Sequence, residues 1–205
     1  GEGAEALLTT PGAGKWYRSS GAWARQRVTL SAARASCVEW LPQETILFDA
    51  SLADISFEAR LEGDARLIAW DIVCLGRRGS GERFASGRCR THARIYRDGR
   101  LLWWERARIG GEDRLAASPA GLAGASVFAT FMLAAPEIDD AWLQSAREAS
   151  PGSGIGGVTR LPGLLLARYR GDSSEDARDY FTRLWSCLRE PVTGHPAVRP
   201  RIWST

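Results

Sequence analysis

The sequence predicts a mainly β protein, with stacked or coiled sheets and two α-helices in the C-terminal third. Many short apolar segments, separated by Gly, Pro and Asp, fill the first two thirds of the chain. Helical spacing of apolar residues is confined to residues 136–149 and 173–191. This order excludes an alternating βαβ arrangement, and no internal repeat of fixed period accompanies it.

Composition limits the protein classes that fit. The 205 residues are 44% apolar, which suits a single domain over residues 1–205 with a sizeable core. The balance of 27 basic and 24 acidic residues, net +3, is too even for a typical nucleic-acid binder. We therefore expect no nucleic acid as partner. No stretch has the length of a membrane span, so we expect no membrane as partner either. Four widely spaced cysteines favour a reducing cytoplasm over a disulfide scaffold.

The first third of the chain reads as five short strands, at residues 6–10, 23–30, 36–41, 44–49 and 54–62. In the last of these the period is strictly two, which places Ile55, Phe57, Ala59 and Leu61 toward the core. The segment 11–21 reads as a loop that combines glycines, aromatics and cations. A functional loop and an ordinary solvated turn remain equally good readings of it.

The central strand, residues 66–76, is apolar on both faces and should be covered on both sides. Asp71 shares one face with Leu67, Ala69 and Val73. A carboxylate in such a strand is costly to bury unless it is paired or hydrogen-bonded. A structural salt bridge with one of the many arginines and a functional acid are therefore both open.

A hairpin follows, with strands at 88–95 and 101–109 and a turn at Asp98-Gly99. Alternation puts Glu105 on the apolar face of its second strand, as a second inward carboxylate. A neighbouring arginine is again the structural alternative. His92 falls on the polar face, where we expect a solvated surface residue.

The last part of the chain is predicted as strand 122–134, helix 136–149, a glycine-rich loop at 151–157, strand 164–169 and helix 173–191. Ser173 and Asp176 suggest a capping box at the start of that last helix, and Pro191 its end. A core-facing stripe at helical spacing follows the cap: Ala177, Tyr180, Phe181, Leu184, Trp185 and Leu188.

Common catalytic motifs are absent from the sequence. The sequence has no nucleophile elbow, HExxH or kinase motif, and His92 and His195 lie too far apart for a His/Cys metal cage. Two inward carboxylates could carry out acid–base chemistry, so a β-rich hydrolase using Asp71 and Glu105 is one hypothesis. A plain binding module with structural acids is another.

Several longer segments resemble one family. Residues 10–21 (TPGAGKWYRSSG), 39–48 (EWLPQETILF), 67–77 (LIAWDIVCLGR) and 200–205 (PRIWST) are similar, in collinear order, to motifs of the urease accessory protein UreD family, also called UreH. Glu82-Arg83-Phe84 and Trp104-Glu105-Arg106 follow in the family's order. The resemblance covers the chain from about Leu7 to Thr205.

This resemblance implies a coiled, β-helix-like stack of strands and a non-enzymatic scaffold in nickel-dependent urease maturation. It implies a complex with UreF, with UreG through UreF, and with the urease apoprotein, in the cytoplasm. Nickel is expected to pass in transit through an internal path, without a tightly bound cofactor. Asp71 and Glu105 match family positions associated with that path, where isolated oxygen ligands would let the metal move on.

Two departures from the family pattern accompany the resemblance. The family's N-terminal strands, with a Gly-Gly-Asp motif, are not found in these 205 residues, so we expect an N-terminally truncated member. Gly14 stands where a small hydroxyl residue is common. Because those N-terminal strands are missing, we expect the segment from Ala6 to Leu30 to lack part of its cover.

Overall fold

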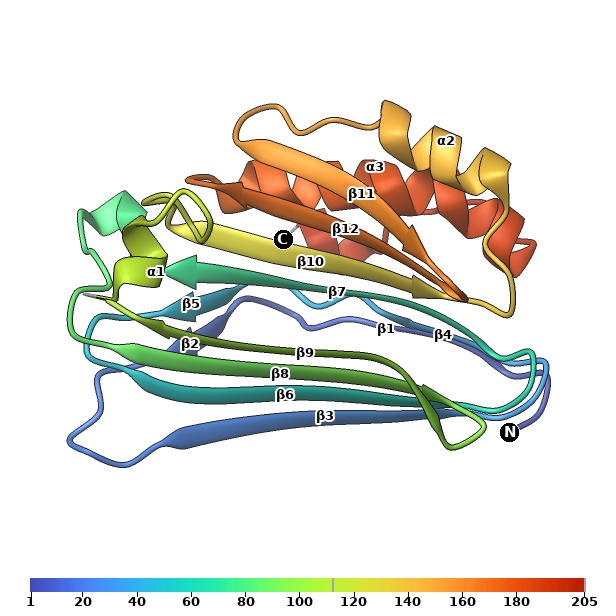
Figure 1. Cartoon of the computed structure of the whole chain (residues 1–205), viewed down its shortest axis with the longest axis horizontal. Coiled ribbons are helices and arrows are strands. Elements are labelled where there is room, and N and C mark those ends of the chain that lie inside the picture. The colour runs from blue at the N-terminus through green and yellow to red at the C-terminus, as the bar shows by residue number, and fades with distance from the viewer. Residues whose placement is uncertain (112, 205) are drawn as a thin grey trace.

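The computed structural model of the chain describes residues 1–111 and 113–204, and it confirms a mainly β fold. Two open sheets of mixed strand direction face each other, and α2 and α3 lie on the outer side of the larger one (Figure 1). The molecule therefore has three layers, with helices, sheet A and sheet B in that order.

Sheet A has eight strands and sheet B has four. Sheet A contains β1 (Glu5–Leu8), β2 (Gly14–Trp16), β4 (Cys37–Trp40), β5 (Thr45–Leu47), β7 (Arg66–Leu75), β10 (Val127–Ala134), β11 (Ile155–Leu161) and β12 (Leu164–Gly171). Sheet B contains β3 (Ala24–Ala32), β6 (Leu52–Leu61), β8 (Arg88–Arg97) and β9 (Arg100–Gly110).

In the first half of the chain, successive strands pass repeatedly from one sheet to the other, so the chain forms a coil whose turns contribute to both sheets. Within sheet A, β1, β4 and β7 pair in parallel, as do β2, β5 and β7. Within sheet B, β3, β6 and β8 pair in parallel. Each turn of the coil thus adds strands to both sheets, which is the coiled stack that the sequence leads us to expect. Strand β7 ends this parallel half and pairs antiparallel with β10 on its other edge.

Two α-helices were expected in the C-terminal third, and both are present with altered bounds. Helix α2 spans Asp140–Glu148 and is capped by Asp139, whose side chain accepts from the Ala141 amide; it begins later than Pro136. Helix α3 spans Ser174–Thr193. Ser173 is confirmed as the cap, since its Oγ accepts from the Asp176 amide at 3.0 Å. The carboxylate of Asp176 accepts from Ser153 Oγ at 2.6 Å, so the second bond of the predicted capping box is replaced by this one.

Several features of the prediction are wrong. The strand expected at 122–134 begins only at Val127, as β10. Helix α3 does not stop at Pro191 but continues to Thr193 and is capped by Gly194, which takes the left-handed conformation at φ 81°. The segment 151–157 is only partly a loop, because β11 begins at Ile155. A short strand, β2, lies inside the expected loop 11–21, and a one-turn helix, α1 (Arg114–Ala117), follows β9.

Apolar side chains fill both spaces between the layers. The core between sheet A and the helices contains the predicted α3 stripe, packed against Ile68, Trp70 and Phe131. Smaller clusters lie between the sheets, around Leu67, Ile95 and Met132 and around Leu47, Val73 and Cys89. Strand β7 is therefore covered on both faces, as its composition predicts. None of the helices in the described part of the chain is long and apolar enough to cross a membrane.

Candidate functional site

Two adjoining cavities lie between the sheets. The larger has a volume of about 580 Å³ and is bordered by β8, β9, β10 and β12. The smaller, about 90 Å³, is bordered by the segment 10–14 and by β3, β4 and β6. Asp71, Ile55, Phe57 and Met132 line both. Asp71 is the acidic residue at this junction, because the other three shared residues are apolar.

Asp71 owes its position to the alternation of β7. Leu67, Ala69 and Val73, on the same face, pack between the sheets, and Asp71 lies opposite Thr130 of β10 in the strand register. Burial raises the pKa of Asp71 from its ordinary 3.8 to about 6, and the Ile72 amide offsets part of that rise. Among the described residues, no cationic side chain lies within ion-pair distance of this carboxylate.

Glu105 lines the larger cavity but is held by an arginine. Arg168 of β12 reaches across from sheet A and donates to both carboxylate oxygens, at 2.6 and 2.7 Å. The same guanidinium lies 3.4 Å from Thr130 Oγ1. This bidentate pair links the edge of sheet B to sheet A at the border of the cavity, and it fixes the geometry of both side chains.

The two acids predicted from the sequence thus face the same space but differ in state. The salt-bridge alternative describes Glu105, whereas it does not describe Asp71. Sequence reasoning missed Arg168, although the signal was available. Leu164, Leu166 and Arg168 alternate with the helix-facing residues of β12, so Arg168 had to point between the sheets.

The two histidines lie in different parts of the fold, one on β8 and one after α3. His92 was expected to be a solvated surface residue. It is half-buried and borders the larger cavity, so it is only partly exposed to solvent. His195 lies in the segment after α3, with its Nε2 2.8 Å from a carboxylate oxygen of Glu5. Within residues 1–111 and 113–204, no group of three or more His, Cys, Asp or Glu is placed to hold a metal.

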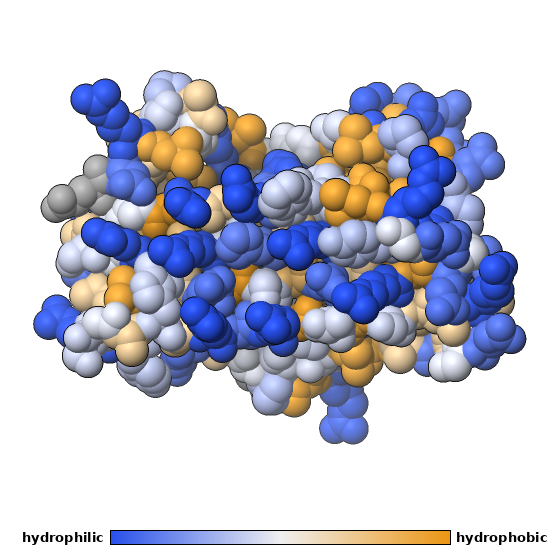
Figure 2. Space-filling view, turned by 60° about the horizontal axis from the view of Figure 1, so that its bottom comes forward, coloured by the Kyte–Doolittle hydropathy of each residue, from blue (hydrophilic) through white to orange (hydrophobic). Residues whose placement is uncertain are grey.

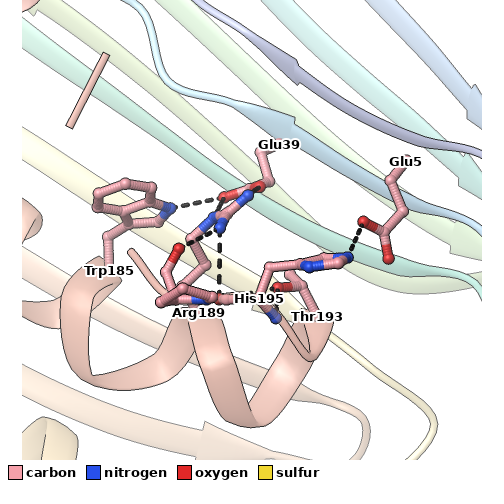
Figure 3. A network of polar contacts seen from close by, with 7 residues as sticks. Glu5, Glu39, Trp185, Arg189, Thr193 and His195 are labelled. Atoms are coloured by element: carbon pink, nitrogen blue, oxygen red, sulfur yellow. Dashed lines mark hydrogen bonds and ion pairs between the residues drawn. The ribbon is translucent and has the colours of Figure 1, made fainter. Parts of the chain in front are cut away.

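A second buried carboxylate, Glu39, fastens the C-terminal segment to the coil (Figure 3). Glu39 is 3% exposed and accepts from Trp185 Nε1 at 2.6 Å. Arg189 forms an ion pair with it at 3.0 Å and also donates to the Pro196 carbonyl at 2.5 Å. Because the charge of Glu39 is balanced and its oxygens are bonded, we read this cluster as structural. Thr205, the last residue of the C-terminal motif, lies outside the described residues.

Fold and site define a class of protein, namely a two-sheet coil with two adjoining cavities between its sheets and, among the described residues that line both, an unpaired acid, Asp71. Comparisons with known proteins narrow this class. The family model described as UreD urease accessory protein matches residues 1–204. The chain belongs to the UreD urease accessory protein family.

Similar relatives support this membership along the whole chain. UreD of Azoarcus sp. (strain BH72) is 48% identical over 205 residues, which are 100% of this chain and 72% of the relative. UreD of Dechloromonas aromatica (strain RCB) is 49% identical over 209 residues, covering 100% and 73%. UreD of Pseudomonas aeruginosa PAO1 is 50% identical over 206 residues, covering 100% and 72%.

Proposed function

We propose that this protein is a non-catalytic scaffold in urease maturation and that nickel passes Asp71 on its way across the molecule. Family membership supports the role in maturation. The second part is supported by one observation, the position of Asp71 at the junction of the two cavities. Together they suggest a route that enters between the sheets on one side and leaves on the other.

The chemistry of Asp71 suits a metal in transit. A carboxylate oxygen binds a divalent cation, but a single unpaired acid has too few donors to retain one. Conduction needs binding sites that are weak enough to release their ion. With a pKa near 6, Asp71 is mostly ionised at neutral pH and becomes protonated under mildly acidic conditions. Glu105 contributes less, since Arg168 already occupies both of its oxygens.

The partners that we propose follow from the family rather than from the geometry. They are the urease apoprotein, UreF and, through UreF, UreG, with the protein acting in the cytoplasm. Nickel is the cargo of this complex, and no tightly bound cofactor is part of the proposal.

The hydrolase hypothesis has one observation in its favour. A cavity of about 580 Å³ with two carboxylates has the size of many substrate sites. The pairing of Glu105 with Arg168 weakens it, because the guanidinium already engages both carboxylate oxygens and keeps them from a substrate. The binding-module hypothesis leaves the unpaired Asp71 unexplained.

The test is the nickel content of urease matured with Asp71→Asn in the complete protein. The amide is nearly isosteric and a poorer ligand, so we expect nickel content to fall several-fold while the melting temperature is kept or rises. Asp179→Asn, an exposed acid on α3, is the matched control and should load nickel normally. Urease that receives full nickel from stable Asp71→Asn protein would remove this residue from the route.

Glu105→Gln provides a second comparison. Its ion pair is partly exposed, with side-chain exposures of 50% for Arg168 and 30% for Glu105, so its loss should cost little stability. We expect a smaller effect on nickel loading than for Asp71→Asn. A larger effect would move the route to the Glu105 side of the cavity.

A further inference from the structure

The outer face of sheet B carries an unusual concentration of arginine. In Figure 2 the lower side of the molecule comes forward, and hydrophilic side chains dominate it, with hydrophobic ones scattered among them. Strand register aligns these residues in rows across β3, β6, β8 and β9. We call the following residues the arginine face: Arg25, Arg27, Arg60, Arg90, Arg94, Arg106 and Arg108.

Opposite charges are scarce on this face. Its outward acids on these rows are Asp54 and Glu58 of β6, so its formal charge exceeds the +3 of the entire chain. Asp54 pairs with Arg25, and Glu58 with Arg60 and Arg94. Within the described part of the chain, no carboxylate lies at ion-pair distance from Arg27, Arg90, Arg106 or Arg108.

The register places like charges against each other. Arg90 of β8 lies directly opposite Arg108 of β9, and Asp54 of β6 lies opposite Arg90 on the other side. Like charges at opposed positions of a sheet are destabilising, so folding alone gives no reason for the Arg90–Arg108 pair. Solubility alone favours a surface on which positive and negative side chains are interspersed. Binding of an anionic group relieves this repulsion.

Aromatic rings hold several of these guanidinium groups in place. Arg90 stacks on Trp23 at 3.9 Å from the ring centroid. Arg94 and Arg106 both lie over the ring of the half-exposed Trp104, at 5.8 and 5.2 Å from its centroid. A stacked guanidinium keeps its N–H edges free, and those edges match carboxylates in bidentate geometry.

We propose that the arginine face is a docking surface for an acidic segment of a partner protein, lying along β8 and β9. Strands are about 4.8 Å apart, so these two strands offer a basic strip roughly 10 Å wide. Asp54 and Glu58 border the strip on β6. A DNA duplex or an anionic bilayer extends beyond it and brings phosphates against these acids, whereas an acidic protein segment fits within it.

The test is binding of a fluorescent peptide of about ten glutamates, at roughly 20 mM and 150 mM salt. We expect binding at the lower salt, weakened at least about tenfold by Arg90→Glu with Arg108→Glu. The matched control is Arg147→Glu with Arg199→Glu, two exposed arginines away from sheet B, which should change the Kd less than about twofold. The neutral pair Arg90→Gln with Arg108→Gln serves if the first variant does not fold.

Two results would overturn the proposal. One is an equal loss of affinity in the control variant, which would show that net charge alone binds the peptide. The other is tighter binding, at the same salt, of a short DNA duplex or of phosphatidylglycerol vesicles than of the peptide. Because the assay contains neither nickel nor urease, its outcome is independent of the proposed route past Asp71.

Discussion

At the scale of single residues, Asp71 and Glu105 illustrate how neighbours set the behaviour of an acid. Both carboxylates face the same cavity between the sheets. Arg168 satisfies Glu105 with two hydrogen bonds, whereas Asp71 has no cationic partner among the described residues and is stabilised by one backbone amide, that of Ile72. Glu105 is therefore largely a structural residue, and Asp71 carries an electrostatic cost in the folded protein at neutral pH.

The raised pKa of Asp71 makes stability depend on pH. The folded protein binds the proton of this group more tightly than the unfolded chain does. Its stabilising contribution is therefore complete below pH 3.8 and is lost as the pH rises through about 6. Asp71→Asn has no such group, so we expect the variant to gain stability relative to the wild type between pH 4 and 7, by about 1–3 kcal/mol.

Denaturant titrations of both proteins at several pH values measure this difference. Subtracting one profile from the other removes the contributions of all other titrating groups. A difference that stays constant from pH 4 to 7 would show that the folded environment leaves the affinity of Asp71 for its proton unchanged.

At the scale of elements, helix α3 is the main support of the larger core. Trp185 is fully buried and packs against Trp203, with ring centroids 5.5 Å apart. Its indole N–H also donates to the buried Glu39. We expect Trp185→Ala to destabilise the fold by roughly 3–5 kcal/mol, from the cavity it leaves and the hydrogen bond it removes.

Trp104→Ala is the matched control for this substitution, because Trp104 is 51% exposed on the outer side of sheet B. Its loss should cost less than about 1 kcal/mol. Chemical denaturation of the two variants compares them directly. Equal losses would mean that α3 is held mainly by contacts other than its apolar stripe.

At the scale of the molecule, much of the fold could be predicted because two periodicities dominate. The period of two in β6 predicts a strand with one buried face, and the two apolar faces of β7 predict a strand covered on both sides. Both predictions agree with the burial of these strands in the structure. Strand β11 was missed because glycine is a poor strand former. Gly156 is needed there for close packing, since a Cβ would come within 3.0 Å of Tyr180 Cε1. Only the folded chain reveals that contact.

The site was predictable to a similar degree. Alternation places Asp71, Glu105 and Arg168 between the sheets, but it gives no distance between strands that are far apart in sequence. The sequence contains many arginines, and its pattern does not show which of them forms the ion pair with Glu105. The junction of two cavities at Asp71 depends on how β3, β4 and β6 pack around β7, and this is a property of the tertiary structure.

The parallel coil that ends at β7 also has a consequence for folding kinetics. Strands β4 and β5 pair with β7. Among the described residues, β1 pairs with β4 and β2 with β5, so each turn needs the next one along the chain as its template. We expect assembly to begin around β7, β10, β12 and α3 and to proceed toward the N-terminus. Such non-local pairing is slow, because the chain loses the entropy of loop closure before the stabilising contacts between strands can form.

Native-state hydrogen exchange tests this order. Amides of β7, β10 and β12 should exchange only through global unfolding, whereas those of β1 and β3 should exchange through smaller local openings. Equal protection along the entire coil would instead mean that both sheets form and open in a single step.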